Sequence, residues 1–371
     1  MKIGIMVPSV GAFGQKGFYN MQEVGHAKAL SKLCDFVEVY KLVEEHQQYT
    51  EEMIEGCENA KLYLLPSKRV GSNGIPNMSL VNSTLDVLLL CADTQLAVPK
   101  IERWAKKNNV RLIPYIGVIE SHSTSKLKKT IMDLLFRRNL AVYQKYHCIA
   151  KTPKVKDELS RMGVQEITVG PVGLDFSLLH KSSPEDDLEQ LRQTHRFEPE
   201  DRIVLMVGRM EEDRNPLDCV AVFRALRQKD PRYKLCLIGK GSLKDALFQE
   251  LEQAGLLDAV CYFERIPNNR MWEFYAVSEL LISFSRTEIF GMSILEAMYY
   301  RTPVFAIHAP GPDYILEHRV SGFLSDTPEQ MAEQILTCDT QSQVISNAYE
   351  RVTNLFSWQT TAEIIMGQID R

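Results

Sequence analysis

The sequence predicts an α/β protein built from two doubly wound parallel-sheet domains, and three observations carry this prediction. First, 371 residues are too many for one small hydrophobic core and suit two domains of ordinary size. Second, short, almost continuously apolar runs alternate with longer amphipathic segments along the chain, which is typical of parallel strands covered by helices on both faces. Third, the polar and charged stretch Ser177–Asp201, with Pro184 and Pro199, indicates a linker between two such series.

The first half of the chain is expected to form a domain over residues 1–175. Its apolar runs predict strands at Lys2–Val7, Phe36–Tyr40, Leu62–Leu65, Val87–Leu90, Arg111–Val118, Cys148–Ala150 and Ile167–Val169. The amphipathic segments between them predict helices, for example at Leu96–Lys107, Leu127–Lys145 and Val155–Met162.

The second half is expected to form a domain over residues 176–354. Strands are predicted at Ile203–Val207, Leu235–Ile238, Val260–Phe263, Leu280–Phe284 and Val304–Ile307. Helices are predicted at Leu217–Gln228, Leu243–Ala254, Met271–Ala276 and Ile294–Tyr300. Open parallel sheets bind ligands at the carboxyl ends of their strands, so the functional residues are expected in the loops that follow the strands.

The composition excludes several classes of protein. With 45% hydrophobic and 25% charged residues, the chain resembles a soluble globular protein. A formal net charge of -5 argues against nucleic-acid binding, which needs clustered Lys and Arg. No stretch approaches the roughly 18 apolar residues that a membrane span needs, and the short apolar run Ile3–Val7 after Met1 does not resemble a signal peptide.

The eight cysteines are scattered, without a CxxC pair, and several lie inside apolar runs. This distribution predicts reduced thiols and a cytoplasmic protein, because disulfide frameworks and zinc sites place cysteines at characteristic spacings.

The strongest chemical signal is the segment Glu288–Met298, EIFGMSILEAM. It follows the predicted strand Leu280–Phe284, and a helix is expected to begin near Ser293. Gly291 allows a ligand to approach the backbone closely, and the free N–H groups of a helix start favour an anion. Glu296 is expected to face the same place, where one carboxylate can accept hydrogen bonds from two ribose hydroxyls.

This segment also has a purely structural interpretation. Ser293 and Glu296 have the spacing of a capping box, in which Glu296 only satisfies the helix N-terminus. Glu288 could equally be an ordinary loop acid. Taken alone, the two acids therefore decide nothing.

The turn after the predicted strand Ile203–Val207 supplies context. Arg209 and Arg214 are its only cations, and fixed guanidinium groups stabilise the charge that grows on a departing diphosphate without a metal ion. The alternative is that both arginines pair locally with the acids of the same turn, which are Glu211, Glu212 and Asp213.

In order along the chain, several segments resemble the large retaining glycosyltransferase family 4, also described as glycosyl transferases group 1. These segments are Gly208-Arg209-Met210 with Arg214, Leu237–Ser242 (LIGKGS), Phe263–Pro267 (FERIP), Glu288–Met298, Thr302-Pro303-Val304, Val172–Asp175 and Phe356-Ser357-Trp358. The resemblance spans essentially the whole chain. It implies the GT-B fold, in which two Rossmann-like domains face a central cleft and a last helix, here 355–371, packs back on the first domain. The first domain, 1–175, is then expected to bind the acceptor, and the second, 176–354, to bind the nucleotide-sugar donor.

The resemblance also implies roles for individual residues. Glu296 is expected to bind the ribose, Glu288 to sit beside the donor sugar, and Arg209 and Arg214 to hold the diphosphate. Backbone groups complete the expected donor site, from Phe290, Gly291 and Met292 at the sugar and from Arg265 and Ile266 at the base. Gly14 and Gly17 are expected in a loop that closes over the diphosphate or meets the acceptor, unless they form a plain βα turn.

The sequence departs from the family pattern in places. Arg214-Asn215 occupies the position where the family usually has Lys-Gly, and Arg301 occupies a position where the family has Gly. Asp313 matches only loosely a position where the family has Glu. The family commonly places a His after the strand that contains Pro114; counting puts Glu120 there, with His122 two residues further on. Glu120 and His122 are thus candidate sugar-contacting catalytic residues, although a lone His at a strand end is as often a helix cap or a surface residue.

The resemblance predicts a retaining hexosyltransferase that moves a hexose or N-acetylhexosamine from a nucleotide-diphosphate sugar, by default a UDP-sugar. The expected acceptor is a hydroxyl of a glycan, a lipid-linked glycan or a glycosylated protein, as in cell-surface polysaccharide synthesis. No cofactor and no metal site are expected, because the sequence shows no DxD-like motif or cluster of His and acids suited to Mg²⁺. Two alternatives remain open, a non-catalytic GT-B accessory subunit and a sugar-nucleotide epimerase.

The segment 126–145 raises the question of a membrane partner. Basic residues alternate there with apolar ones, namely Lys126, Lys128, Lys129, Arg137, Arg138 and Lys145 with Ile131, Leu134, Leu135 and Phe136. Such a helix can touch anionic lipid at the inner membrane face. The favoured alternative is that its apolar side packs on the sheet while its basic side is solvated.

Overall fold

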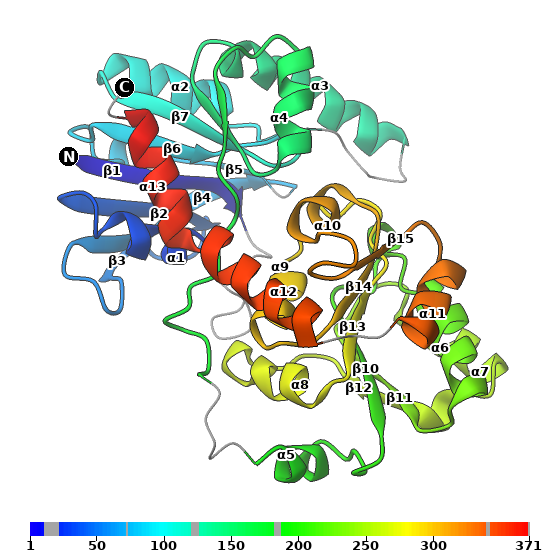
Figure 1. Ribbon diagram of the computed structural model, residues 1–371. Helices are drawn as coiled ribbons and strands as arrows, with labels where there is room; N and C mark the ends of the chain where they lie inside the picture. Colours follow the sequence, from blue (N-terminus) through cyan, green and yellow to red (C-terminus); the bar gives the residue numbers. More distant parts are fainter. Residues whose placement is uncertain (11–21, 72, 120–125, 182–186, 339–341, 370–371) are drawn as a thin grey trace. The chain divides into compact units, whose positions relative to one another are not determined.

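A computed structural model describes residues 1–371 except 11–21, 72, 120–125, 182–186, 339–341 and 370–371 (Figure 1). The chain divides into two compact units. Unit 1 comprises Met1–Gly173 and Ser357–Arg371, and unit 2 comprises Leu174–Phe356.

Unit 1 is built on a sheet whose main strands run parallel in the order β4-β2-β1-β6-β7-β8-β9. These strands are β1 (Lys2–Val10), β2 (Phe36–Glu44), β4 (Ala60–Val70), β6 (Val87–Cys91), β7 (Arg111–Ile116), β8 (Cys148–Ala150) and β9 (Ile167–Val169). Two short strands pair antiparallel with this sheet, β3 (Thr50–Met53) on β4 and β5 (Asn73–Ile75) on β1 and β4. The sequence did not predict them, because β3 is wholly exposed and β5 has only three residues, so neither forms an apolar run.

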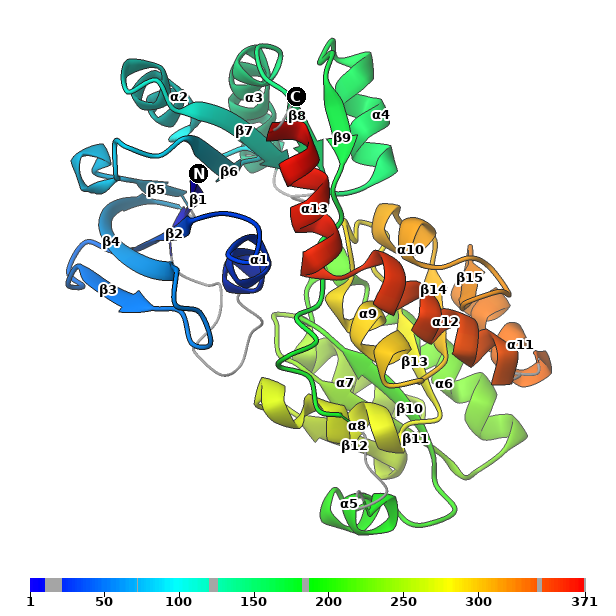
Figure 2. The same cartoon turned by 60° about the vertical axis from the view of Figure 1, so that its left-hand side comes forward.

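The described helices of unit 1 include one from the far end of the chain. They are α1 (Gln22–Leu30), α2 (Val98–Lys107), α3 (Lys126–Tyr143), α4 (Pro153–Arg161) and α13 (Trp358–Ile369). Helix α13 packs against α1, as both ribbon views show (Figures 1 and 2). The ring of Trp358 stacks on that of His26 with centroids 4.9 Å apart.

Unit 2 contains a sheet whose described strands all run parallel, in the order β12-β11-β10-β13-β14-β15. The strands are β10 (Arg202–Val207), β11 (Tyr233–Ile238), β12 (Val260–Phe263), β13 (Leu280–Ser283), β14 (Val304–Ile307) and β15 (Phe323–Ser325). The α-helices are α5 (Leu188–Thr194), α6 (Asp218–Lys229), α7 (Lys244–Gln253), α8 (Met271–Val277), α9 (Met292–Tyr299), α10 (Pro310–Ile315), α11 (Pro328–Thr337) and α12 (Ser342–Leu355). The three-residue strand β15 was not predicted.

The segment expected to be a linker is in large part structured. Residues 188–194 form α5. The side chain of Asp187 caps the N-terminus of this helix, and His195 follows its last residue. The His195 ring is 5% exposed and its Nε2 lies 2.8 Å from a Glu273 carboxylate oxygen. The linker interpretation was wrong for this part of the segment, because a few buried anchors hold an otherwise polar stretch onto unit 2.

The chain order reverses at one pair of neighbouring strands in each sheet. In unit 1 this pair is β1 and β6, and in unit 2 it is β10 and β13. The loops that leave the carboxyl ends of such a pair diverge, and the crevice between them is where open α/β sheets bind ligands. We call these places the unit 1 switch point and the unit 2 switch point.

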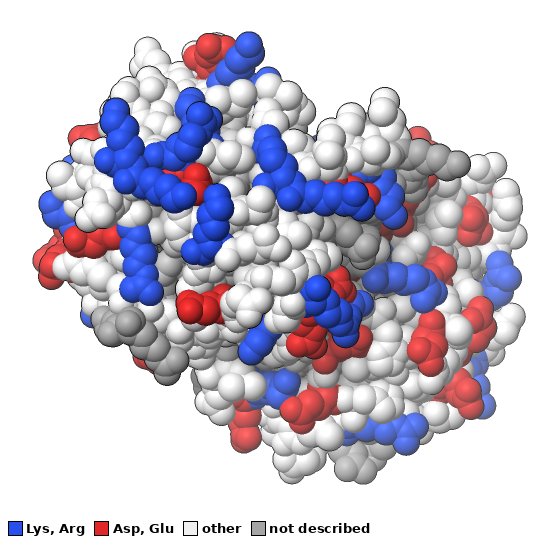
Figure 3. Space-filling view, turned by 90° about the horizontal axis from the view of Figure 1, so that it is seen from above, with Lys and Arg blue, Asp and Glu red and all other residues white. Residues whose placement is uncertain are grey.

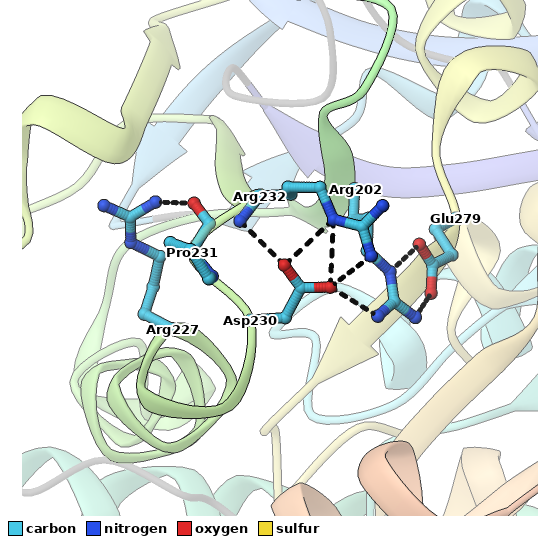
Figure 4. Close-up of polar contacts among 6 residues, drawn as sticks. All are labelled: Arg202, Arg227, Asp230, Pro231, Arg232 and Glu279. Atoms are coloured by element: carbon cyan, nitrogen blue, oxygen red, sulfur yellow. Dashed lines mark hydrogen bonds and ion pairs between the residues drawn. The ribbon is translucent and has the colours of Figure 1, made fainter.

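An ion network lies at the opposite, amino-terminal edge of the unit 2 sheet (Figure 4). Arg202 at the start of β10 donates to both carboxylate oxygens of Glu279, at 2.5 and 2.8 Å, and lies 3.1 Å from Asp230. Asp230 also accepts from Arg232, and these bonds, first of all that from Arg232, lower the pKa of the Asp230 carboxyl. The network joins the starts of β10, β11 and β13, at the edge of the sheet opposite the switch-point loops.

The eight cysteines are free thiols, and burial raises the pKa of both Cys91 and Cys148 to about 12. Within the described residues, no helix combines the length and the apolar character needed to cross a bilayer.

Candidate functional site

The turn after β10 is packed against the loop after β11. The Gly208 amide donates to the Ile238 carbonyl at 3.0 Å, and the Met210 amide donates to the Lys240 carbonyl at 2.9 Å. Gly239 has a φ of +147°, and a Cβ atom there would overlap the Gly208 carbonyl oxygen. A side chain at position 239 is therefore incompatible with the close approach of these two loops.

The same turn is fastened to the loop that follows β13. The Asn215 side-chain amide donates to the Phe284 carbonyl at 3.3 Å. The hydroxyls of Ser285 and Thr287 both donate to the Asp213 carbonyl, at 3.0 and 3.1 Å. These bonds cross the unit 2 switch point and fix the two loops relative to each other.

Arg214 and Glu288 form an ion pair across these loops. The Glu288 side chain is 17% exposed, so it is not an ordinary solvated loop acid. Asp213 pairs with both arginines of the turn, 2.7 Å from Arg209 and 3.7 Å from Arg214. The expected local pairing is thus correct for Asp213, whereas Glu211 instead accepts hydrogen bonds from the Ser242 amide and hydroxyl, at 3.2 and 2.6 Å.

Helix α9 begins at Met292, one residue before Ser293 and two before the predicted first residue, Ile294. Its N-cap is Gly291, with a φ of +101°, and no side chain caps the helix. The capping-box interpretation of Ser293 and Glu296 is therefore wrong, because Ser293 already lies in the first helical turn. Instead, the Glu296 carboxylate accepts a hydrogen bond of 2.8 Å from the Tyr275 hydroxyl. Burial, and then the Glu296 charge, raises the pKa of Tyr275 well above its ordinary value.

The positions that depart from the family pattern have local explanations. Arg301, at the end of α9, adopts a left-handed φ of 62°, and its guanidinium lies over the Tyr349 ring, 4.1 Å from the centroid. Asp313 accepts from His308 Nδ1 at 2.6 Å. Arg301 therefore occupies a conformation that favours glycine, with its side chain stacked on an aromatic ring.

Comparison with known families bears directly on this site. Residues 187–351 match the model of the family described as glycosyl transferases group 1, and the match includes the whole unit 2 switch point. We call this matched stretch, which is 165 of the 371 residues, the group 1 domain after the family model that it resembles.

The named relatives have low sequence identity to this chain, and each is longer than the region that matches. A D-inositol 3-phosphate glycosyltransferase of Segniliparus rotundus is 25% identical over 212 residues, which are 55% of this chain and 46% of that protein. An alpha-monoglucosyldiacylglycerol synthase of Streptococcus pneumoniae is 23% identical over 184 residues, 49% of this chain and 42% of that protein. The matched region therefore spans less than half of either relative.

Solved structures match the whole chain. HepE of Anabaena, solved in complex with UDP and glucose, is 19% identical with a TM-score of 0.73, and the match covers 100% of this chain and 99% of that one. A sucrose-phosphate synthase of Thermosynechococcus elongatus is 17% identical with a TM-score of 0.77 and covers 100% and 98%. These likenesses confirm the predicted GT-B fold class of two Rossmann-like domains.

The group 1 domain contains functional candidates that sequence reasoning missed. Lys240 follows β11, is 53% exposed, and lies 3.4 Å from Glu264. The LIGKGS segment contains this lysine and was recognised as a motif, so the signal was available. Tyr275, which holds Glu296, gave no signal, because its position in α8 is remote in sequence from α9.

Some of the remaining predicted residues lie in the described part of the chain, and others do not. Arg265 and Ile266 lie in the loop after β12, and Phe290 is buried with its ring against those of Tyr314 and Phe356. Four predicted residues lie outside the described part of the chain, and the structure says nothing about them: Gly14, Gly17, Glu120 and His122.

Helix α3 differs from the favoured sequence expectation. Phe136 is buried, but Leu127, Ile131 and Leu134 are 71%, 49% and 66% exposed. Arg138 donates to the carbonyls of Gln95 and Leu96, at 3.3 and 2.9 Å. The apolar side of this helix is therefore only partly packed on unit 1.

Basic side chains also gather on helix α2, which lies at the top of Figure 1. The exposed ones are Lys100, Arg103, Lys106 and Lys107. Figure 3 looks from that side and shows Lys and Arg side chains gathered at its left.

Proposed function

We propose that this protein is a retaining, metal-independent hexosyltransferase that takes a sugar from a nucleotide-diphosphate donor held by unit 2. The observation that carries the proposal is the bonded pair of loops at the unit 2 switch point. One loop provides Arg209 and Arg214, the other provides Glu288, and the Arg214–Glu288 ion pair joins them within the group 1 domain.

The diphosphate of the donor is proposed to bind the cations at this edge. Arg209, Arg214 and Lys240 follow neighbouring strands, and each has a carboxylate partner, which is Asp213, Glu288 and Glu264 respectively. Guanidinium groups bind phosphate oxygens in a bidentate manner, and a diphosphate carries more charge than a single carboxylate. The same groups stabilise the charge that develops on the leaving diphosphate, which is chemistry that needs no metal ion.

The nucleoside is proposed to bind at α9. Tyr275 donates to the Glu296 carboxylate and thereby fixes its orientation toward ribose hydroxyls, in the way that outer groups orient ligand-binding residues. Arg265 and Ile266, in the loop after β12, are proposed to frame the base. UDP is the default nucleotide, and the UDP bound by the HepE neighbour supports this choice.

Glu288 is proposed to act on the sugar. Its carboxylate would orient the sugar hydroxyls and stabilise the positive charge that develops at the sugar carbon as the bond to the diphosphate breaks. The incoming hydroxyl oxygen would bond to the anomeric carbon on the face from which the diphosphate leaves, so the anomeric configuration is retained. The departing phosphate oxygen would accept the proton of that hydroxyl. The ion pair with Arg214 couples the group at the sugar to a group at the leaving diphosphate.

The proposed acceptor is a hydroxyl of a glycan, a lipid-linked glycan or a glycosylated protein. Named relatives are an inositol phosphate glycosyltransferase, a glucosyldiacylglycerol synthase and a mannosyltransferase, so they support glycosyl transfer without selecting one acceptor.

Thermal unfolding with UDP-, GDP- and ADP-sugars tests donor binding. We expect one nucleotide to stabilise the protein, by about 2.7 kcal/mol at a hundredfold excess over Kd. Turnover should survive EDTA, and NMR of the product should show the anomeric configuration of the donor. If none of the nucleotide sugars stabilises the protein, a non-catalytic accessory subunit is favoured. If the product is a free sugar nucleotide with inverted configuration at C2 of the sugar, an epimerase is favoured.

A further inference from the structure

The carboxylate of Asp213 lies between the two guanidinium groups of the turn after β10. One oxygen atom, Oδ2, is 2.7 Å from Arg209 Nη2 and 3.7 Å from Arg214 Nε. Arg209 donates a hydrogen bond to this oxygen, and Arg214 also forms the ion pair with Glu288. A single carboxylate oxygen therefore bridges the two cations that the proposed function assigns to the diphosphate.

The main chain at Asp213 is held in place, whereas its side chain is not enclosed. The Asp213 carbonyl accepts hydrogen bonds from the hydroxyls of Ser285 and Thr287. Residues Glu212–Arg214 form a short 3-10 turn that ends at Asn215, which has a left-handed φ of 45°. The Asp213 side chain is 30% exposed. Rotation about its side-chain bonds can therefore move the carboxylate into solvent while the two loops stay fixed.

The two arginines are neutralised by two acids of the same unit. Arg209 and Arg214 face Asp213 and Glu288, so two positive charges meet two negative charges. The guanidinium fork matches both carboxylate and phosphate oxygens, and it binds both through charge-assisted hydrogen bonds. A phosphate group that arrives at these arginines therefore competes with a carboxylate for the same donors.

The two carboxylates differ in how readily they can give way. The Glu288 side chain is only 17% exposed, and its carboxylate also accepts a hydrogen bond of 3.4 Å from the Phe290 amide. The Asp213 side chain is more exposed, and water can solvate its carboxylate as soon as it leaves the arginines. Asp213 is therefore the acid that a phosphate group can replace at the lower cost.

We propose that Asp213 is an internal competitor of the donor diphosphate. Its carboxylate occupies the place of a phosphate group between Arg209 and Arg214, and binding of a nucleoside diphosphate displaces it. This inference rests on the proposed function, because it takes the diphosphate to bind these two arginines. It assigns to Asp213 a role that weakens donor binding, whereas the residues named above support it.

An internal competitor makes the site selective for ligands of higher charge. A singly charged anion would replace the Asp213 carboxylate by a group of equal charge and would gain little from the exchange. A diphosphate carries more than one negative charge, so it gains more from the two arginines than the carboxylate does. After sugar transfer, the return of Asp213 to the arginines favours release of the nucleoside diphosphate product.

The opposite role for Asp213 is to orient the two arginines, as outer groups orient ligand-binding residues. The two roles predict effects of opposite sign on affinity. Removal of a competing charge strengthens diphosphate binding, whereas removal of an orienting group weakens it. A substitution of equal size that removes only the charge decides between them.

The test is isothermal titration of the whole chain and of Asp213→Asn with UDP, GDP or ADP, whichever matches the nucleotide sugar that stabilises the parent. Asn keeps the size of the side chain, and the carbonyl that bonds to Ser285 and Thr287 is unchanged. We expect Asp213→Asn to bind the diphosphate about three- to tenfold more tightly at low salt, and the gain to shrink as the salt concentration rises. Unchanged or weaker binding overturns the proposal.

Matched variants assign the gain to the bridging carboxylate. Glu212→Gln removes one negative charge from the neighbouring, exposed residue, and it should bind the diphosphate as the parent does. Equal gains in Glu212→Gln and Asp213→Asn would mean that the general field of the turn sets the affinity, which contradicts the proposal. Asp213→Ser also removes the charge and should show a gain, so the result does not depend on the folding of one variant.

Failure of this inference and failure of the proposed function give different results. If UDP, GDP and ADP all fail to bind the parent and the variants, the proposed function is wrong and the inference is wrong with it. If the diphosphate binds the parent and Asp213→Asn binds it no more tightly, only the inference is wrong.

Discussion

The two switch points share a topology and differ in chemistry. At the unit 2 switch point, the residues of interest lie in two loops directly after β10 and β13, and hydrogen bonds between these loops hold them together. At the unit 1 switch point, a pocket of about 130 Å³ is bounded by α1, several strand ends and helix α13, and we call it the unit 1 pocket. Its lining includes Glu23, Asp93, Lys41 and Lys151. The reversal of strand order fixes where each site lies, while the side chains of the loops and helices decide what it can bind.

The largest expected effect is at Glu288. If unit 2 carries the chemistry, Glu288→Gln should lower turnover about 100-fold or more, because it removes charge beside the developing positive centre. Steady-state kinetics with the nucleotide sugar found in the thermal screen measure this.

Glu212→Gln is the matched control for Glu288, because Glu212 lies in the adjoining turn with its side chain exposed. Full turnover by Glu288→Gln, together with lost donor affinity in Glu296→Ala, would mean that Glu288 has no part in the chemistry.

The next effect concerns how the unit 2 loops are held. Gly239→Ala would force a Cβ atom against the Gly208 carbonyl at a φ that L side chains avoid. We expect a loss of about 2–4 kcal/mol in the free energy of unfolding, measured in urea, and weaker binding of UDP. Gly255→Ala has a φ of +69° but nothing within 4 Å, and it should cost only about 1 kcal/mol. Equal losses in the two variants would show that backbone conformation alone, without the close approach, sets the cost.

A pH dependence should mark the unit 1 pocket. Burial lowers the His26 pKa from 6.5 to about 3, so between these values the unfolded chain binds a proton that the folded chain does not. The free energy of unfolding is therefore not reduced by His26 above about pH 6.5. Below that pH, the unfolded chain gains the proton, and the free energy of unfolding falls by up to about 1.4 kcal/mol per pH unit. Urea unfolding of the parent and His26→Gln at several pH values measures the difference. Parallel curves for the two proteins would disprove neutral burial of His26.

The smallest expected effect is at α3. Its exposed Leu127, Ile131 and Leu134, beside Arg137, should give weak co-sedimentation with anionic vesicles, with each cation contributing about 1 kcal/mol. Replacing the three apolar residues by Ser should abolish it, and raising the salt concentration should weaken it. If the parent does not bind the vesicles, or if its binding does not depend on salt, α3 has no electrostatic contact with lipid and only a structural role.

The sequence predicted the strands well where they are continuous apolar runs, and β8, β9, β12 and β14 have the predicted bounds. It missed β3, β5 and β15, which are polar or only three residues long. It also assigned α5 to a linker, because the few buried contacts that hold this segment on unit 2 leave no periodic pattern.

The two loops of the unit 2 switch point could be located from the sequence, because each is one continuous segment that directly follows a clear strand. The roles assigned to their residues stay predictions. The capping box was misassigned because the positive φ of Gly291 starts α9 before Ser293. The unit 1 pocket could not be predicted, since it joins His26 to Trp358 across nearly the whole length of the chain. No local pattern records such a pairing.

The chain leaves unit 1 once and returns to it once, and this has a consequence for the architecture. Leu174 and Phe356, the first and last residues of unit 2, are joined by a backbone hydrogen bond of 2.8 Å. In topological terms, unit 2 is an insertion into a single discontinuous domain, with its two ends closed on each other. Proteins tolerate the insertion of a domain whose two ends lie close together. Unit 2 could therefore be excised and replaced by a short connection, which would leave α13 to pack on α1 from the same polypeptide.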